Sequence, residues 1–291
     1  MKAQYSNQLI SSFLLFLENR VTKSGESYFN ISGNFYPSTS LYNGLATYSS
    51  QFRPIIADHS IGAATHMTGV YLNSVFITPG TSGFSGINYA AGQLYFTGRL
   101  PSTATLSGAF TVNEFNFLLT DKSDEEILFE TKYSNRPTNN ITATNQTGLN
   151  SNQITYPVIF LKNDGGQNEE YCFGGIERTE TNVKGILLCD SQFNLDAISS
   201  ILKDSVRTNV PLLSASQFPF NYLGYHRSGY YNYDSLVASN LANNQVAFIE
   251  DVFVSKFNTN SLLTSELKKI NPNIYVGIAE WTISKIRTPR C

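Results

Sequence analysis

Charged residues are scarce in this 291-residue sequence. Lys, Arg, Asp and Glu together make up 14% of the chain, whereas roughly 25% is typical of soluble domains. The net charge is −2, and most of the positive residues are scattered along the chain. Proteins that neutralise many phosphates carry a basic stripe or patch. The sequence therefore gives no electrostatic reason to expect nucleic-acid recognition.

Cysteine is rare as well. The three cysteines, Cys172, Cys189 and Cys291, are odd in number and show no CxxC spacing. A secreted disulfide framework is therefore not indicated, and a reducing compartment is expected. A single bridge between Cys172 and Cys189 stays open.

The three histidines offer little for catalysis or metal binding. His59 and His66 lie seven residues apart beside Asp58, but no third ligand has a suitable spacing. The segment predicts extended chain, which would hold the two rings far apart. His226 falls in a tyrosine-rich loop, where an exposed or interface position is expected. Hydrolases of the serine or cysteine type need a histidine paired with the nucleophile, so we predict no metal, no cofactor and no such enzyme.

Two further catalytic patterns are incomplete. The glycine-rich run Gly80–Gly86 has no Lys–Ser/Thr pair after it and no following helix, so it does not predict a phosphate-binding loop. Glycosidases need two carboxylates in one cleft, but the acidic residues here are dispersed and no pair stands out. The sequence therefore predicts a protein that is not an enzyme.

Long hydrophobic runs are missing too. The most apolar segment near the start, Leu9–Leu17, is too short to span a bilayer. It also lacks the basic cluster and the cleavage site of a signal peptide. Apolar residues recur with helical spacing between Ser6 and Val21. We predict a buried helix there and no contact with a membrane.

What the sequence has in abundance is aromatic and uncharged polar residues. It contains 20 Phe and 17 Tyr, and its polarity comes mostly from Asn, Ser and Thr. Subunit interfaces favour this composition, because tyrosine brings contact area and a hydroxyl group while unpaired charge is costly to bury. An ordinary β-rich protein with an uncharged polar surface is the alternative.

Apolar periodicity predicts mostly strands. The expected strands are Gly69–Ile77, Gly92–Phe96, Thr111–Leu119, Glu126–Tyr133, Thr155–Asn163, Gly185–Asp190, Val246–Phe257 and Asn273–Ile286. Helices are expected at Phe193–Arg207, capped by Asn194, and at Ser261–Ile270. For Ser24–Tyr48, rich in Gly, Ser and Asn, we expect one short strand and a loop.

This order of elements predicts an α+β, mainly β fold, with antiparallel sheets or a barrel and a few peripheral helices. The chain forms either one compact β-rich domain over residues 1–291 or two closely packed halves. The halves would cover about 1–133 and 155–291, separated by a polar loop at 134–154.

A tyrosine-rich tract, Phe218–Ser235, is the clearest candidate binding surface in the second half. Its tyrosines are Tyr222, Tyr225, Tyr230, Tyr231 and Tyr233. Tyrosine mixed with Gly, Ser and Asn is typical of protein-binding loops. Stacking of a small ligand and packing of the rings back onto the core both stay open.

The segment from Phe52 to Phe96 carries a resemblance to a family. It reads F-R-P-I-x-A-D, then G-V-Y-L-N, then G-T-S-G-x-x-G-I-N-Y-x-x-G-Q-L-Y-F. This ribbon of strands and tight turns resembles head–tail connector or neck subunits of tailed bacteriophages. Interface positions on this ribbon are Tyr71, Asn73, Gly80, Gly83 and Tyr89. The five tyrosines of the later tract are further interface candidates, on the ground of their composition.

The resemblance implies a non-catalytic virion protein that forms an oligomeric ring at the head–tail junction, as part of a neck, connector or tail terminator. Expected partners are further copies of the chain, other virion proteins such as portal, adaptor or tail proteins, and passing genomic DNA bound without sequence specificity. A carbohydrate- or receptor-binding module of a tail fibre or adhesin is the alternative interpretation.

Overall fold

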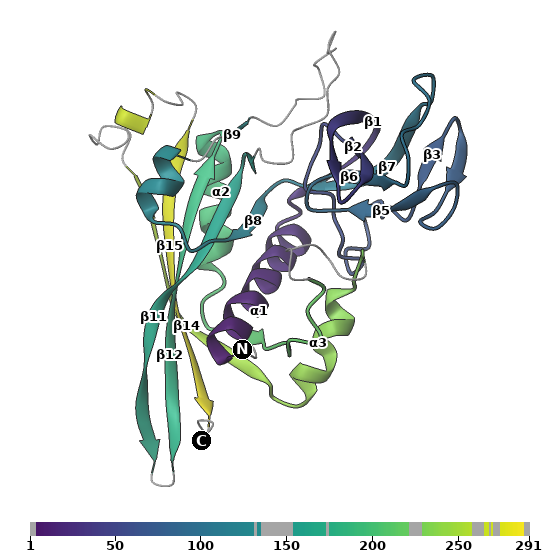
Figure 1. Ribbon diagram of the computed structural model, residues 1–291. Coiled ribbons are helices and arrows are strands. Elements are labelled where there is room, and N and C mark those ends of the chain that lie inside the picture. Colours follow the sequence, from purple (N-terminus) through teal and green to yellow (C-terminus); the bar gives the residue numbers. More distant parts are fainter. Residues whose placement is uncertain are drawn as a thin grey trace.

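The protein is mainly β, with antiparallel sheets and a few helices, as the sequence predicts (Figure 1). The computed structural model describes residues 4–130, 133–134, 154–172, 175–220, 229–257, 265–267, 269 and 274–287. Within these ranges, the strands form a seven-stranded sheet, a six-stranded sheet and a short parallel pair. The helix α1 lies between the two large sheets (Figure 1).

The first sheet has the strand order β4-β3-β7-β1-β2-β6-β5. Its strands are β1 (Tyr28–Tyr42), β2 (Leu45–Ser49), β3 (Val70–Leu72), β4 (Val75–Ile77), β5 (Phe84–Asn88), β6 (Gln93–Phe96) and β7 (Leu106–Asn113). The strand predicted at Gly92–Phe96 is confirmed. The one predicted at Gly69–Ile77 is two short antiparallel strands, β3 and β4, which a turn at Asn73 and Ser74 joins.

The expectation of one short strand and a loop at Ser24–Tyr48 is wrong, because β1 runs for 15 residues through it. Its polar residues Ser32 and Asn34 face outward, while Phe35 is buried against Phe110. A sheet with one solvated face tolerates this alternation. The small polar residues therefore mark the outer face of a strand.

The second sheet has the order β13-β14-β15-β12-β11-β8. Its strands are β8 (Asn116–Leu119), β11 (Val158–Cys172), β12 (Ile176–Cys189), β13 (Asn209–Pro211), β14 (Val246–Lys256) and β15 (Tyr275–Arg287). The strands predicted at Val246–Phe257 and Asn273–Ile286 are confirmed. The one predicted at Thr111–Leu119 is divided between β7 and β8, and these belong to different sheets.

The predicted strands Thr155–Asn163 and Gly185–Asp190 are the inner ends of a much longer hairpin. Most of the glycine-rich stretch between them is not a connecting loop, because it continues β11 and β12. A bulge between Asn163 and Gly166 interrupts the register. A Cβ atom at Gly166 would lie 2.1 Å from the backbone oxygen of Glu180. Glycine is needed there because the two backbones approach so closely.

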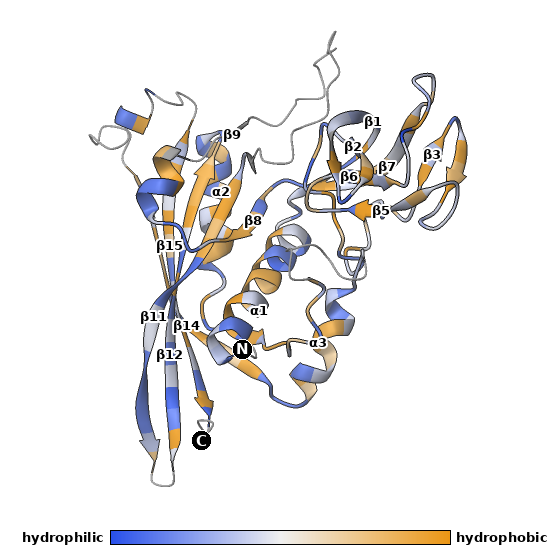
Figure 2. Cartoon of the chain, in the orientation of Figure 1, coloured by the Kyte–Doolittle hydropathy of each residue, from blue (hydrophilic) through white to orange (hydrophobic). Residues whose placement is uncertain are grey.

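The outer part of this hairpin, called the arm below, comprises Asn163–Cys172 and Ile176–Asn182. Residues 163–172 are all exposed. Figure 1 shows the arm reaching past the helices, and Figure 2 shows it largely hydrophilic, whereas the inner ends of β11 and β12 are hydrophobic. Both thiols of the predicted optional bridge, Cys172 and Cys189, are free.

The helices are α1 (Tyr5–Asn19), α2 (Gln192–Lys203) and α3 (Tyr233–Ala242). The predicted N-terminal helix is confirmed, and it continues as a π-helical turn, η1 (Arg20–Ser24). The helix α2 is confirmed as well, but Ser191, whose hydroxyl accepts a hydrogen bond from the Asn194 amide at 3.1 Å, is its N-cap. The sequence interpretation missed α3.

The strand predicted at Glu126–Tyr133 is wrong over its first five residues, which form a π-helical turn, η2 (Glu126–Glu130). Ser123 and Glu126 cap this turn reciprocally. The Ser123 amide donates to Glu126 Oε2 at 2.9 Å, and the Glu126 amide donates to Ser123 Oγ at 3.2 Å. This S-x-x-E capping box was a readable signal in the sequence.

The short parallel pair joins β9 (Tyr133–Ser134) and β10 (Ile154–Thr155). Most of the predicted polar loop at 134–154 lies outside the described residues, as does most of the predicted helix Ser261–Ile270. The two large sheets separate between β7 and β8. Whether the chain is best described as one domain or as halves at about 1–133 and 155–291 stays a prediction.

The core of the six-stranded sheet forms between α1 and the strands. Leu9, Phe13 and Leu17 of α1 are fully buried there, and the Phe13 ring lies edge-on to the Trp281 ring at 5.2 Å. Leu15, on another side of the same helix, packs into the core of the seven-stranded sheet. The helix α1 therefore contributes to both cores.

We predict that Phe13→Ala lowers the free energy of unfolding by about 3–5 kcal/mol, because a fully buried ring leaves a cavity against Trp281. Urea unfolding followed by Trp fluorescence measures the change. Phe193→Ala is the control, since that ring is 80% exposed and its loss should change stability by less than about 0.5 kcal/mol. Equal effects of the two substitutions would contradict this packing.

Candidate functional site

Four of the predicted interface residues lie at exposed positions of the seven-stranded sheet. Tyr71 on β3 is 44% exposed. Asn73 forms the β3–β4 turn with positive φ, and its side-chain oxygen accepts a hydrogen bond from the Thr105 amide at 2.9 Å. Gly80 and Gly83 both adopt positive φ in the next loop. These positions are accessible, and their role as an interface stays a prediction.

Tyr89 has a different position. Its side chain is 2% exposed, and its hydroxyl donates to the Met67 carbonyl at 2.6 Å. Burial raises the pKa of this phenol well above its usual value. In the isolated chain, Tyr89 therefore acts inside the fold, as a core residue that fixes the loop before β3.

The tyrosine-rich tract is only partly described, because Tyr222 and Tyr225 lie outside the described residues. Tyr231 and Tyr233 are 7% and 5% exposed. Tyr231 pairs through its backbone with the segment around Asp58, which is a parallel bridge. Packing of the rings back onto the core is thus the observed arrangement for these two residues. Tyr230, at 47% exposure, is accessible.

The expectation that His59 and His66 lie far apart is wrong. Their ring centroids are 4.2 Å apart, and the other face of His59 stacks on Tyr230 at 4.3 Å with an interplanar angle of 2°. The chain turns twice between the two histidines, so it is not extended. Burial, followed by the proximity of His66, lowers the pKa of His59. The described residues contain no group of three or more His, Cys, Asp and Glu side chains that could hold a metal ion.

Asp58 joins three segments that are distant in the sequence. It is 5% exposed, and its carboxylate accepts hydrogen bonds from the Asn19 side chain at 2.8 Å and from the Tyr233 amide at 3.0 Å. The Ser60 amide and hydroxyl donate to it as well, at 2.9 and 3.0 Å. A buried carboxylate needs such donors. Asp58 therefore ties the end of α1 to the start of α3.

Glu18 completes this buried polar cluster. Its carboxylate accepts a hydrogen bond from the Asn113 side chain on β7 at 3.0 Å. Burial, and then the nearby charge of Asp58, raise the pKa of Glu18 to about 7. Burial, and then the nearby charges of Glu18 and Asp58, raise the pKa of the Tyr231 phenol. Glu18 therefore keeps its proton until the pH approaches about 7.

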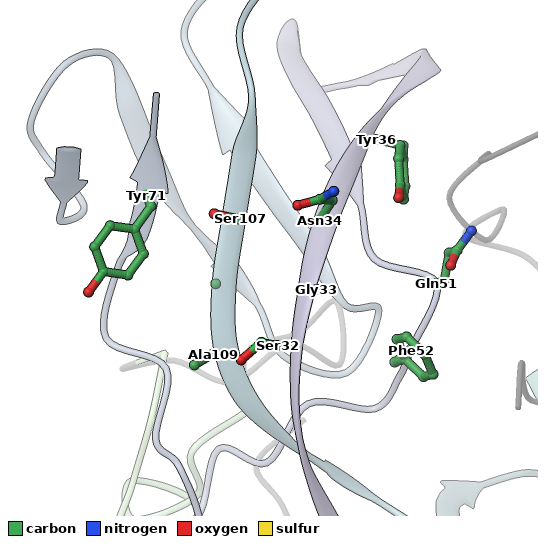
Figure 3. Close-up of a pocket in the computed structure, with 10 residues that line it drawn as sticks. Ser32, Gly33, Asn34, Tyr36, Gln51, Phe52, Tyr71, Ser107 and Ala109 are labelled. Carbon is green, nitrogen blue, oxygen red and sulfur yellow. The ribbon is translucent and has the colours of Figure 1, made fainter. Parts of the chain in front are cut away.

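The outer face of the seven-stranded sheet carries a hollow, called the trough below, that the sequence did not predict. This trough has a volume of about 460 Å³. Its floor comes from β1 and β7, whose residues pair directly across it, Ser32 with Ala109 and Asn34 with Ser107. Figure 3 shows Tyr71 on one side of the floor and Phe52 on the other.

Two charged surfaces of opposite sign lie on the six-stranded sheet. The arm carries five carboxylates, and none of them makes an ion pair with the described residues: Asp164, Glu169, Glu170, Glu177 and Glu180. Its one arginine, Arg178, is paired with Glu250 on β14. Five carboxylates and one arginine leave the arm with a net negative charge.

The second charged surface is a groove of about 530 Å³ beside the start of α1. Lys285 and Arg287 of β15 line it, and its remaining lining residues are uncharged: Gln4, Tyr5, Ser6, Gln8, Leu212, Leu213, Ser214 and Gln245. The Arg287 guanidinium lies over the Tyr5 ring at 4.8 Å. Burial lowers the pKa of Lys285. This basic groove is a candidate acceptor for an acidic partner.

No protein-family model and no curated protein matches the chain. Among the described residues, no helix is both long and apolar enough to cross a membrane.

We predict that the buried cluster makes stability fall as the pH rises from about 4.5 to about 7. The folded chain keeps the Glu18 proton in this window, whereas the unfolded chain releases it near pH 4.5. The stabilisation is complete below pH 4.5 and is lost as the pH passes 7, by about 3 kcal/mol in total. Urea unfolding at pH 4.5 to 8 measures it.

Glu18→Gln is the matched variant, because it keeps the shape and an acceptor for Asn113 but cannot titrate. Relative to the variant, the wild type should lose about 3 kcal/mol of unfolding free energy as the pH rises from about 4.5 to about 7. Parallel pH profiles for the two proteins would show that Glu18 titrates normally.

Proposed function

We propose that the protein is a non-catalytic structural subunit of a tailed-phage virion, which forms an oligomeric ring at the head–tail junction. The observation that supports this most is the exposed acidic arm. Its partners would be further copies of the chain, adjoining portal, adaptor or tail proteins, and genomic DNA that passes without being read.

The arm has the features of an assembly element. Beyond Leu161, β11 has no partner on its outer edge within the described part of the chain, since β8 pairs only with Val158–Leu161. An exposed edge of this length can accept a further strand. The carboxylates of the arm oppose uncontrolled pairing with other strands, because they repel any edge strand that is also negatively charged. The arm is therefore suited to a partner that supplies positive charge.

The chain itself carries such a surface in the basic groove. An acidic arm and a basic groove on one chain allow a contact in which the arm of one copy meets the groove of the next. Lys285 is partly desolvated without an ion-pair partner among the described residues, so it would gain from a carboxylate. Complementary charge also selects the register of such a contact.

A contact between two different patches of the same chain is heterologous. Repeating it produces a closed ring when the rotation between neighbours closes, and a filament when it does not. The resemblance of the Phe52–Phe96 ribbon to neck subunits favours the ring. That ribbon also exposes Tyr71, Val75 and Phe76 on the β3–β4 hairpin, far from the arm (Figure 1). It offers a separate surface for an adjoining virion protein.

We predict that charge reversal on either side of this contact weakens assembly. Glu169→Lys with Glu170→Lys removes attraction at the arm, and Lys285→Glu removes it at the groove. Each change should weaken self-association by about tenfold or more, because close charge pairs at interfaces contribute a few kcal/mol. Combining all three substitutions should restore assembly. Mass photometry and sedimentation velocity measure the populations.

Lys23→Glu is the control, because Lys23 pairs with Asp234 away from the arm and the groove. It should leave self-association unchanged. Circular dichroism shows whether each variant is folded. If the reversed arm and reversed groove do not rescue each other, the arm–groove contact is wrong, although a ring built through another surface would remain testable by imaging.

The virion assignment has its own test. Proteomics of purified particles should detect the chain, and negative-stain images of the purified protein should show rings. A strictly monomeric protein that is absent from particles would overturn the proposal.

A further inference from the structure

The trough on the seven-stranded sheet has a neutral, polar floor. Ser32, Asn34 and Ser107 point outward from it, and their side chains make no hydrogen bond within the described part of the chain. Two hydroxyl groups and one amide offer both donors and acceptors. The floor can therefore hydrogen-bond a ligand that itself carries donors and acceptors.

The walls of the trough are aromatic. Tyr71 stands on the β3 side, and Phe52 and Tyr36 stand on the β1 side (Figure 3). Gln51, beside Phe52, adds another unpaired amide. The Tyr71 ring is 44% exposed and lies 5.3 Å from Phe76, so it is supported from behind while its surface remains accessible.

The strands that form the floor of the trough pack closely on the core. Gly33 and Gly108 pair across β1 and β7, and their missing side chains would point to the inner face, where a Cβ atom on Gly108 would lie 3.4 Å from Met67. Large inner residues such as Phe35 and Phe110 then fill the space beneath the glycines. The outer face carries only small side chains between its aromatic walls.

We propose that the trough is a binding site for a neutral saccharide. A sugar ring presents C–H groups to an aromatic face and hydroxyl groups at its edge, and the trough offers both kinds of contact side by side. Its volume falls within the roughly 300–1,000 Å³ of small-ligand sites. The inference does not depend on ring assembly.

The lining argues against other ligand classes. It contains no Lys, Arg or His, so phosphates and nucleic acids find no countercharge. It contains no Asp or Glu, so the pair of carboxylates that hydrolyses a glycosidic bond is missing from the lining, and the site would bind without cleaving. Peptides that bind by strand addition use a sheet edge, whereas the trough lies on a face.

The site differs from the tyrosine-rich tract that the sequence alone favours for ligand stacking. That tract meets Asp58 and His59, and no residue of it lines the trough. Tyr230 therefore supplies a matched control, because its exposure of 47% is close to the 44% of Tyr71.

The test uses the full chain and an array of neutral bacterial surface polysaccharides with maltohexaose, cellohexaose and chitohexaose. Isothermal titration calorimetry then measures the affinity for the oligosaccharide that binds most strongly. Tyr71→Ala should weaken binding by about tenfold, since one stacked ring supplies up to about that factor. Tyr71→Phe keeps the ring and should retain most of the affinity. Asn34→Ala should weaken binding through the lost amide.

Tyr230→Ala should leave the affinity unchanged. The proposal is overturned if none of these saccharides binds at millimolar concentration, or if Tyr71→Ala binds as tightly as wild type. It is also overturned if Tyr230→Ala and Tyr71→Ala lose affinity equally, because the bound sugar would then lie elsewhere. Thermal unfolding of each variant confirms that a lost affinity does not reflect a lost fold.

Discussion

The packing of α1 between the two sheets is the constraint on which the rest of the structure depends. Leu9, Phe13 and Leu17 bury one side of the helix against the six-stranded sheet, and Leu15 enters the other core. At the end of the helix, Glu18 and Asn19 hold the seven-stranded sheet and α3 through hydrogen bonds. The helix α1 thus sets how the six-stranded and seven-stranded sheets are arranged. Its apolar side chains pack into both cores, and the hydrogen bonds of the buried polar side chains fix its end.

The helices and strands were predicted correctly from the sequence where the apolar residues followed a single helical or strand periodicity. The spacing of Leu9, Phe13 and Leu17 gave the helix, and the apolar runs of β14 and β15 gave the strands. The prediction failed for β1 and for the arm, where Gly, Ser and Asn are usual loop residues. In β1 they form a solvated face, and in the arm Gly166 is required by a close backbone contact with Glu180. Tertiary context overrode local preference in both places.

The candidate sites show the same limit more strongly. The trough combines short pieces near residues 32–36, 51–52, 71 and 107–109, so no window of sequence contains it. The contact between His59 and His66 depends on two turns between them, which the sequence analysis did not predict. The tyrosines near residue 231 were visible as a group, but only the fold separates the exposed Tyr230 from the buried Tyr231 and Tyr233.

The few charged residues of this chain are unevenly distributed over its surfaces. The arm carries five carboxylates and one arginine, and two cations line the basic groove, whose other lining residues are uncharged. The lining of the trough, on the other sheet, is uncharged. In a chain with few charges, each unpaired one has a large share in deciding which surfaces attract each other. A contact between arm and groove leaves the trough uncovered by charge-driven assembly, so that one chain can use the two sheets for separate tasks.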